Sequence, residues 1–357
     1  MWAPKLIEWY TQNQRKLPWR STPSPYHTLI CEFMAQQTQI NTLIPYYERW
    51  LAQYPSIQDV ANATEDQILK SWEGLGYYSR ARNLHKTAKA IVKDFNGQIP
   101  NDSTTLQTLP GVGPYIAAAI ASIAFNEPIA VVDGNVLRVI TRFFGINDDI
   151  GKESTKQKIQ QRLNQIIKTV DPNPFNQGLM ELGATICTPK NPTCDTCPIN
   201  AMCYAKNMDA TSTLPVKQKK APVPHFTIVV GIIKRPDGKL LITKRKKDQL
   251  LGGLWEFPGG KVNEKESLED AVIREIKEEV NLDITVDGFL CKVNHAYSHF
   301  KITLHAYECN VKDNHSVQCN SADAHEWITI EELDKYAFPK ANKVIIEHLN
   351  PTIESHE

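Results

Sequence analysis

The 357-residue sequence has no long hydrophobic run and no excess of charge of either sign. Its longest apolar stretch, Tyr115–Phe125, spans eleven residues, whereas a membrane-spanning helix needs about 20. Lys and Arg together number 40, and Asp and Glu together also number 40. Bulk charge therefore gives no sign of a nucleic-acid-binding surface, and any such function has to be argued from motifs.

The sequence also begins without the apolar segment of a signal peptide. Hydrophobic residues make up 41% and charged residues 22%, a composition that excludes a disordered or fibrous chain. The length predicts two or three domains. We expect a soluble, cytoplasmic protein with no membrane contact.

Hydrophobic periodicity changes along the chain. It is helical before Cys203, whereas β-branched runs begin at Phe226 around a Pro-Asp-Gly turn at 236–238. Between them, Thr211–Pro224 contains three prolines and three lysines, which is typical of a linker. We predict an all-α domain at 1–210, a linker at 211–224 and an α+β domain at 225–357. The expected helices are 57–72, 81–95, 116–125, 159–169, 268–280, 330–333 and 341–349, and the expected strands are 227–233, 240–243, 292–294 and 302–308.

Four of the eight cysteines lie within seventeen residues, namely Cys187, Cys194, Cys197 and Cys203. Disulfides are disfavoured in an intracellular chain, so the four thiolates are expected to share a metal centre. Either zinc or a [4Fe–4S] cluster suits them. Zinc ribbons usually pair two Cys-x2-Cys units and only one occurs here, which favours the cluster and leaves zinc as the alternative.

Two further motifs carry possible chemistry. Gly111 and Gly113 lie just before an apolar helix, so their backbone N–H groups and the helix N-terminus could bind a DNA phosphate. A plain helix–helix turn is the alternative. Asp133 follows an apolar stretch, where an aspartate is more often only a helix N-cap.

Together these motifs resemble the helix–hairpin–helix DNA glycosylases that carry a four-cysteine loop. The segment Ile30–Gln39 (ICEFMAQQTQ) resembles the Glu-x3-Gln-Gln-Thr-Gln segment of the MutY adenine DNA glycosylases, and Leu17–Arg20, Gly74–Tyr78 and Phe175–Gln177 are similar as well. The resemblance covers nearly the whole chain. It implies an all-α glycosylase domain with a [4Fe–4S] loop at 187–203, followed by a MutT-like (Nudix) α/β/α sandwich.

Release of adenine from deoxyribose passes through an oxocarbenium-like state, so the site needs a proton donor and a carboxylate that stabilises the sugar cation. The resemblance assigns these roles to Glu32, at the purine N7, and to Asp133. The apolar neighbours Ile30, Phe33 and Met34 are expected to raise the pKa of Glu32 by desolvation. From the residues alone, Glu32 could equally be a surface or capping acid.

Tyr115 distinguishes between two types of glycosylase. In relatives similar to endonuclease III, a lysine eighteen residues before the aspartate attacks the sugar, and tyrosine cannot form that Schiff base. By analogy, Tyr115 and Asn135 assist Asp133. We therefore predict a monofunctional glycosylase without strand cleavage.

The resemblance also implies DNA contacts, because the target base has to leave the duplex. Gln37 and Tyr77 would wedge into the base stack, Gly111 and Gly113 would meet a phosphate, and Arg20 and Gln177 belong to the DNA-binding set. Other arginines that could contact phosphates are Arg80, Arg82, Arg138 and Arg142, although surface arginines are usually only solvated.

The C-terminal part contains a pattern close to the Nudix box, from Gly260 to Leu282. Glu275, Glu278 and Glu279 share one helix face, where they could hold Mg²⁺ if this box is active. A solvated acidic helix face is the alternative. Asn281 replaces the usual glycine, and asparagine tolerates the left-handed backbone that ends such a helix.

In MutY proteins this domain typically recognises 8-oxoguanine. Tyr297-Ser298-His299 resembles the recognition loop, which assigns base contacts to Ser298 and His299. We predict a monomeric adenine glycosylase acting on duplex DNA with adenine opposite 8-oxoguanine or guanine. The alternatives are the same enzyme with an added Mg²⁺-dependent nucleotide pyrophosphohydrolase activity, and a non-enzymatic iron–sulfur DNA-binding protein.

Overall fold

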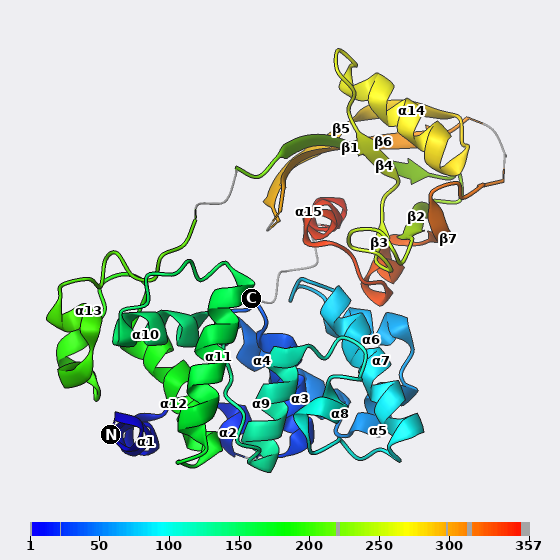
Figure 1. Ribbon diagram of the computed structural model, residues 1–357. Helices are drawn as coiled ribbons and strands as arrows, with labels where there is room; N and C mark the ends of the chain where they lie inside the picture. The colour runs from blue at the N-terminus through cyan, green and yellow to red at the C-terminus, as the bar shows by residue number, and fades with distance from the viewer. Residues whose placement is uncertain (1, 22, 219–221, 298, 313–315, 351–357) are drawn as a thin grey trace. The chain divides into compact units, whose positions relative to one another are not determined.

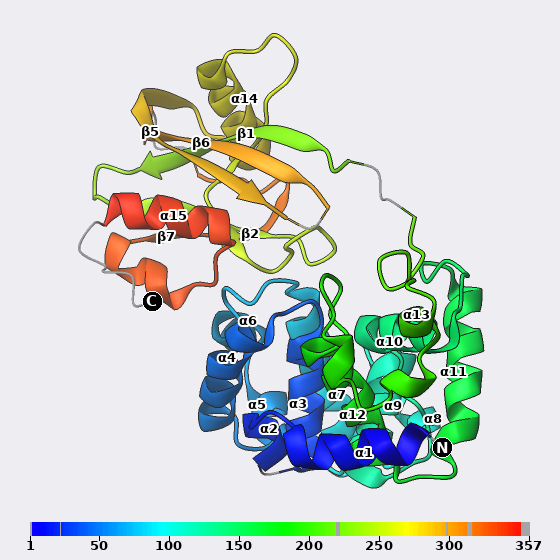
Figure 2. The same cartoon turned by 90° about the vertical axis from the view of Figure 1, so that its left-hand side faces the viewer.

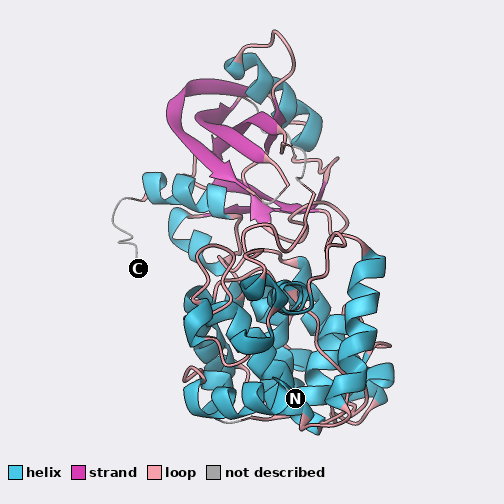
Figure 3. Ribbon diagram, turned by 60° about the vertical axis from the view of Figure 1, so that its left-hand side comes forward, coloured by secondary structure: helices cyan, strands magenta, loops and turns pink. Residues whose placement is uncertain are grey.

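The computed structural model describes residues 2–21, 23–218, 222–297, 299–312 and 316–350. The chain forms two compact units. One comprises Met1–Ala63 and Asn83–Lys220, and the other comprises Thr64–Arg82 and Ala221–Glu357. The first unit is helical and the strands all belong to the second (Figures 1 and 3). No helix of the described chain is long and apolar enough to cross a membrane.

The helices before the strands confirm the predicted all-α character. Their bounds are α1 Trp2–Asn13, α2 Pro18–Ser21, α3 Pro25–Ala35, α4 Ile40–Gln53, α5 Ile57–Asn62, α6 Glu65–Ser71, α7 Ser79–Asp94, α8 Ser103–Leu106, α9 Pro114–Phe125, α10 Gly134–Phe144, α11 Glu153–Ile167, α12 Pro172–Thr185 and α13 Tyr204–Asn207. Two short 3₁₀ turns, Cys194–Thr196 and Asn200–Met202, lie in the cysteine loop.

The prediction of a single helix at 57–72 is wrong. The chain forms α5 and α6 instead, because each has its own capping box, begun by Ser56 and by Thr64. A Ser or Thr cap with a partner three residues later satisfies the free N–H groups that start a helix. The apolar periodicity continues across Ala63, which is why the break was not apparent from spacing alone.

The helices that carry the predicted catalytic residues pack on one another. Helix α9 contacts α3, α8 and α12, and α10 contacts α12. Helix α9 is buried from Ile116 to Ser122 and is rich in alanine, as expected of a helix that is apolar on all sides. Small side chains let its neighbours approach closely. Helix α3 meets its N-terminal end, where Tyr115 bonds Glu32, and α12 reaches its C-terminal half at Ser122 and Ile123.

The second unit contains a mixed sheet. Its strands are β1 His225–Lys234, β2 Leu240–Arg245, β3 Trp255–Glu256, β4 Gly259–Lys261, β5 Ile284–Ala296, β6 Lys301–Val311 and β7 Ala322–Ile328. The strand order is β3-β2-β1-β6-β5, with β4 paired to β1 and β7 to β2; only β1 and β6 run parallel. The strand expected at 292–294 is the central part of the much longer β5.

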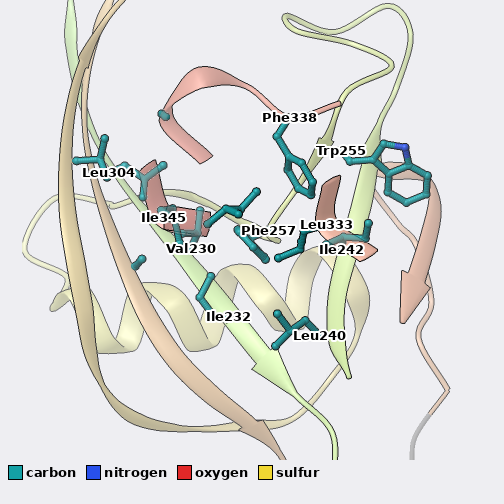
Figure 4. Close-up of a cluster of buried hydrophobic side chains, with 14 of the residues drawn as sticks. Val230, Ile232, Leu240, Ile242, Trp255, Phe257, Leu304, Leu333, Phe338 and Ile345 are labelled. Atoms are coloured by element: carbon teal, nitrogen blue, oxygen red, sulfur yellow. The ribbon is translucent and has the colours of Figure 1, made fainter. Parts of the chain in front are cut away.

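Helices cover both faces of this sheet, which confirms the predicted α/β/α sandwich (Figure 2). Helix α14 (Leu268–Val280) covers one face, and α15 (Lys340–Leu349) covers the other. Figure 4 shows the α15 side, where Phe257 stacks on Phe338 beside Ile345. The helix expected at 330–333 is the 3₁₀ segment Ile330–Lys335. Asn281 ends α14 with φ 54°, as its residue type predicts.

Candidate active site

A cavity of about 810 Å³ opens in the helical unit. It is lined by residues of α1, α2, α3, α9 and α12 and by the segment that precedes α10. Six of its lining residues were singled out in the sequence analysis, namely Arg20, Glu32, Tyr115, Asp133, Asn135 and Gln177. Positions up to 157 residues apart in the sequence therefore meet in one concave site.

Glu32 projects into this cavity from α3, and its side chain is only 7% exposed. Burial raises its pKa to about 7, although a hydrogen bond from Tyr115 lowers it and the charge of Asp133 raises it further. The flanking Ile30, Phe33 and Met34 are fully buried, which confirms the predicted desolvation. Its Oε2 atom is buried without a hydrogen-bond partner within the described chain. A carboxylic acid in this state can donate a proton near neutral pH.

Asp133 is held rigidly at the N-cap of α10. Its Oδ1 accepts from the backbone N–H of Val136 at 2.7 Å, and its Oδ2 accepts from Asn135 Nδ2 at 3.0 Å. Burial raises its pKa and these hydrogen bonds lower it. The capping interpretation and the catalytic one are therefore compatible, because the cap fixes the carboxylate at the wall of the cavity.

The segment leading to Asp133 is fixed from α12. The buried Asn176 side chain accepts from the N–H of Val131 at 2.9 Å and donates to Ser122 Oγ and Ile129 O, both at 2.9 Å. All hydrogen-bonding groups of this amide are thus used on backbone and on α9. Asn176 therefore fixes the backbone path of the segment that precedes Asp133.

Tyr115 lies at the start of α9, where its hydroxyl group is hydrogen bonded to Glu32. Burial raises its pKa well above the usual value, as do the nearby charges of Glu32 and Asp133. The phenol therefore stays protonated. It can donate to Glu32 but cannot act as an amine nucleophile.

Three arginines predicted to contact phosphates lie in the interior instead, so that prediction is wrong for them. Arg138 (9% exposed) donates to Asn135 Oδ1, Gly183 O and Cys187 O at 2.7–2.9 Å. Arg142 (2% exposed) donates to carbonyls of the cysteine loop and of residues 211 and 214. Arg80 is also buried and donates to Leu75 O and Gly76 O. Sequence alone does not show that these guanidinium groups satisfy buried carbonyls.

The four clustered cysteines converge beside α10. Three of them pack against the hydrophobic core of α1, α10 and α12. Burial raises the pKa of Cys194 and brings that of Cys197 to about 11, and the charges of neighbouring thiols add to both shifts. Arg142 Nη1 lies 3.5 Å from Cys187 Sγ. Yet no group of three His, Cys, Asp or Glu side chains in the described ranges could hold a single metal ion.

The glycine hairpin joins α8 to α9. Gly111 has φ +76°, and a Cβ there would lie 2.4 Å from Asn83 Cβ, so this position requires glycine. Gly113 is different, because it is exposed and a Cβ would meet nothing within 4 Å. The open space at Gly113 faces the N-terminus of the twelve-residue helix α9.

The other predicted DNA contacts lie on loops. Gln37 (φ 55°) and Tyr77 (φ 48°) both have left-handed backbones, which is uncommon for residues other than glycine. In the second unit, His299 is exposed and lines a cavity of about 500 Å³ with Tyr297 and Glu279. Ser298 lies outside the described residues.

The Nudix-box carboxylates are engaged by an arginine and by the backbone. Arg274 binds Glu266 (2.6 Å) and Glu275 (2.8 Å) and reaches Glu278 at 3.3 Å. Glu279 instead accepts from the N–H of Gly259 at 2.9 Å. Among the described residues, these acids form no group of three that could hold a metal ion.

Sequence reasoning missed a buried ion pair in the wall of the first cavity. Glu181 of α12 is 1% exposed and binds Arg15 and Arg20, while Arg20 also donates to Gln177 Oε1 at 3.1 Å. A glutamate one helical turn after Gln177, on the buried face of α12, was the only signal available for it.

Comparison with known proteins agrees with this architecture. Two family models match, the HhH-GPD superfamily base excision DNA repair protein at residues 30–165 and the NUDIX domain at residues 229–348. Among solved structures, a thermostable thymine-DNA glycosylase is 28% identical with a TM-score of 0.53, and the match covers 58% of this chain and 95% of that one.

Curated relatives extend the similarity over nearly the whole chain. The human adenine DNA glycosylase is 32% identical over 95% of this chain and 72% of its own length. The adenine DNA glycosylase of Buchnera aphidicola subsp. Schizaphis graminum is 32% identical over 96% of each. With its helical HhH-GPD unit followed by a Nudix-like unit, the chain belongs to the adenine DNA glycosylase family.

Proposed function

We propose that the chain is a monofunctional adenine DNA glycosylase of base excision repair, which hydrolyses the N-glycosidic bond of adenine opposite 8-oxoguanine or guanine. The observation that carries this proposal is the pairing of Glu32 with Asp133. Glu32 is an acid whose pKa burial raises to about 7, and the charge of Asp133 raises it further. One of its oxygens has no hydrogen-bond partner in the part of the chain that the structure describes. Two acids with different environments in one cavity are what acid-catalysed release of a base requires.

The two carboxyl groups divide the chemistry. Glu32 donates its proton to N7 of an adenine that has been flipped into the cavity, which makes the base a competent leaving group. As the C1′–N9 bond breaks, Asp133 stabilises the positive charge that develops on the sugar. Water then adds to C1′ and releases a proton, so the products are adenine and an abasic site. Asn135 keeps Asp133 in place through its hydrogen bond to Oδ2.

Tyr115 supports the monofunctional proposal. A lyase step needs an amine that forms a Schiff base with C1′, and this position offers a phenol hydrogen bonded to Glu32 instead. The DNA strand therefore stays intact after the base has left.

We further propose that Cys187, Cys194, Cys197 and Cys203 hold a [4Fe–4S] cluster. The loop would supply one thiolate to each iron atom of such a cluster. Only one Cys-x2-Cys unit occurs in this loop, whereas zinc ribbons usually pair two such units, which supports the cluster over zinc. The cluster would fix the loop 187–203, whose Cys187 carbonyl accepts from Arg138.

The proposal assigns lesion recognition to the C-terminal domain, within boundaries of 1–210 for the glycosylase domain, 211–224 for the linker and 225–357 for the second domain. His299 and Ser298 would bond the 8-oxoguanine base. Gln37 and Tyr77 would fill the space left by the flipped adenine. We expect the protein to act as a monomer in the cytoplasm, where thiols stay reduced.

The test is release of free adenine from a duplex that carries adenine opposite 8-oxoguanine, with and without a final alkali treatment. We expect adenine release by the native protein, strand breaks only after alkali, and a loss of about 100-fold or more for Asp133→Asn, because the neutral amide cannot stabilise the sugar cation. Unchanged activity of Asp133→Asn would favour a structural role, and strand breaks without alkali would contradict the monofunctional mechanism.

A further inference from the structure

Glu181 is the most deeply buried charged side chain in the cavity wall. It is 1% exposed and accepts four hydrogen bonds, from the N, Nε and Nη2 atoms of Arg15 at 2.7–3.0 Å and from Arg20 Nη2 at 2.9 Å. Burial alone would raise its pKa, but the hydrogen bonds from Arg15 and Arg20 outweigh burial and bring it to about 2. Glu181 is therefore ionised and is shared between two cations.

Arg20 links Glu181 to Gln177 in the cavity wall. Its Nε donates to Gln177 Oε1 at 3.1 Å, and its side chain is 13% exposed. Because the oxygen of Gln177 accepts from Arg20, its Nε2 faces Asn173 Oδ1 at 2.5 Å, and Asn173 in turn donates to Ile123 O at 2.9 Å. One buried carboxylate thus determines the orientation of a guanidinium group and of two amides.

All four of these side chains line the cavity that contains Glu32. The hydrogen bonds among these side chains fix which donors and acceptors the wall presents to a base in the cavity. Without a carboxylate at Glu181, two guanidinium groups would repel each other there, and Arg20 would lose the partner that holds it against Gln177. Preorganised polar groups of this kind raise rates by fixing the reacting geometry.

We propose that Glu181 is a positioning residue for base release: it fixes Arg20 against Gln177 and thereby the hydrogen-bonding pattern that this wall presents to a base in the cavity. Glu181 itself reaches neither the sugar nor the acid Glu32 in this role. It acts through Arg20. The inference rests on the proposed glycosylase function and adds a residue to its site.

Glu181→Gln tests the proposal in the full-length protein. We expect single-turnover adenine release at saturating enzyme to fall about 10- to 100-fold, because a displacement of about 1 Å in a site costs this much. Affinity for the duplex should change less than about twofold, since the wall acts after the DNA has docked. The melting temperature and the iron content of each variant verify its fold.

A double-mutant cycle with Arg20→Gln separates positioning from general destabilisation. If Glu181 acts through Arg20, Glu181→Gln should slow the Arg20→Gln protein less than about threefold, because coupled residues are not additive. Glu127→Gln is the matched control. It removes a carboxylate that accepts two similar hydrogen bonds, from Ser103 N and Oγ at 2.6 and 2.7 Å, outside the cavity, and we expect a wild-type rate.

Glu181→Asp keeps the negative charge but moves it away from Arg15 and Arg20 by the length of one methylene group. Because the charge is kept, this variant serves as the alternative if Glu181→Gln yields little folded protein. It should lower the rate at least threefold. A wild-type rate for either Glu181 variant, or independent losses that add up in the double mutant, would overturn the proposal. Inactive wild-type protein would contradict the glycosylase function itself, which is a different outcome.

Discussion

At the scale of single residues, the site depends on two acids that are held in different ways. Glu32 is flanked by apolar side chains and has an oxygen without a hydrogen-bond partner among the described residues, whereas both oxygens of Asp133 are bonded at the N-cap of α10. Burial raises the pKa of both carboxyl groups, and at Asp133 the hydrogen bonds from Val136 and Asn135 oppose that effect. We propose that the different roles of the two acids follow from this difference in hydrogen bonding.

This contrast predicts the pH dependence of base release. Glu32 acts in its protonated form, and burial raises its pKa to about 7. Activity should therefore be present below about pH 7 and decrease tenfold for each pH unit above it. Measuring single-turnover rates from pH 5.5 to 9 tests this. In Glu32→Gln the rate should be lower by about 100- to 10,000-fold and should lose this dependence. A native profile that is flat across pH 7 would show that Glu32 is not the donor.

Sequence and resemblance together predicted functional roles for Glu32, Asp133 and the four cysteines, because each belongs to a motif with fixed spacing. They did not identify Glu181, and they assigned Arg138 to phosphates. Both side chains bond to partners more than 40 positions away in the sequence, such as Arg15 (181 − 15 = 166) and Cys187 (187 − 138 = 49). No local pattern specifies a buried ion pair whose partners meet only after the helices pack.

At the scale of elements, the close packing of α10 on α12 positions the catalytic loop. Gly183 on α12 lies directly against Asn135, and a Cβ there would be 2.6 Å from Asn135 Cβ and 3.1 Å from its Cα. The backbone cannot move aside easily, since Asn135 also bonds Asp133 and Arg138.

Gly183→Ala should therefore lower the rate of adenine release at least tenfold, because it displaces Asn135 and with it Asp133. Gly178→Ala on the same helix is the control. Its Cβ would meet only side-chain atoms of Tyr10 and Leu6, none closer than 3.2 Å, so we expect a loss of less than threefold. Single-turnover rates and melting temperatures distinguish the two. Equal rates for both variants would contradict this role of the α10–α12 contact.

The hairpin between α8 and α9 gives a second prediction at this scale. Gly113→Ala should fold normally, because a methyl group meets no protein atom there, yet it should weaken DNA binding several-fold if a phosphate approaches this turn. Gly111→Ala should instead destabilise the protein, since φ is +76° and Asn83 is in the way. Thermal unfolding and duplex-binding titrations compare the two. Undiminished DNA affinity of Gly113→Ala would place the phosphate elsewhere.

The elements themselves were predictable where periodicity and capping agreed. Helix α14 was predicted at its observed bounds, and Asn281 ends it as expected. The break between α5 and α6 was not predicted, because apolar spacing continues across it. The long strand β5 was underestimated because its alternation of buried and exposed residues changes phase between Leu290 and Cys291, beside a break in register between Phe289 and Cys291.

At the scale of the whole molecule, the chain combines two units with separate cavities. The cavity of the helical unit contains the acid pair, and the cavity of the second unit contains Glu279 beside Tyr297 and His299. The Nudix-box acids are bound to Arg274 and to the Gly259 backbone. These contacts support our proposal that the second domain recognises a lesion.

We therefore expect the full-length protein to release no monophosphate from 8-oxo-dGTP in the presence of Mg²⁺. Product analysis after long incubation measures this, with Glu278→Gln as a control for trace contaminants. Monophosphate formation that depends on Mg²⁺ and disappears in Glu278→Gln would instead establish the pyrophosphohydrolase activity as a second function.

The most direct test of the central claim is the single-turnover rate of adenine release from two duplexes, one with adenine opposite 8-oxoguanine and one with adenine opposite thymine. The account predicts fast release from the lesion pair, no detectable release from the normal pair, and loss of the fast reaction in Glu32→Gln. Equal release from both duplexes, or an unchanged rate in Glu32→Gln, would contradict it.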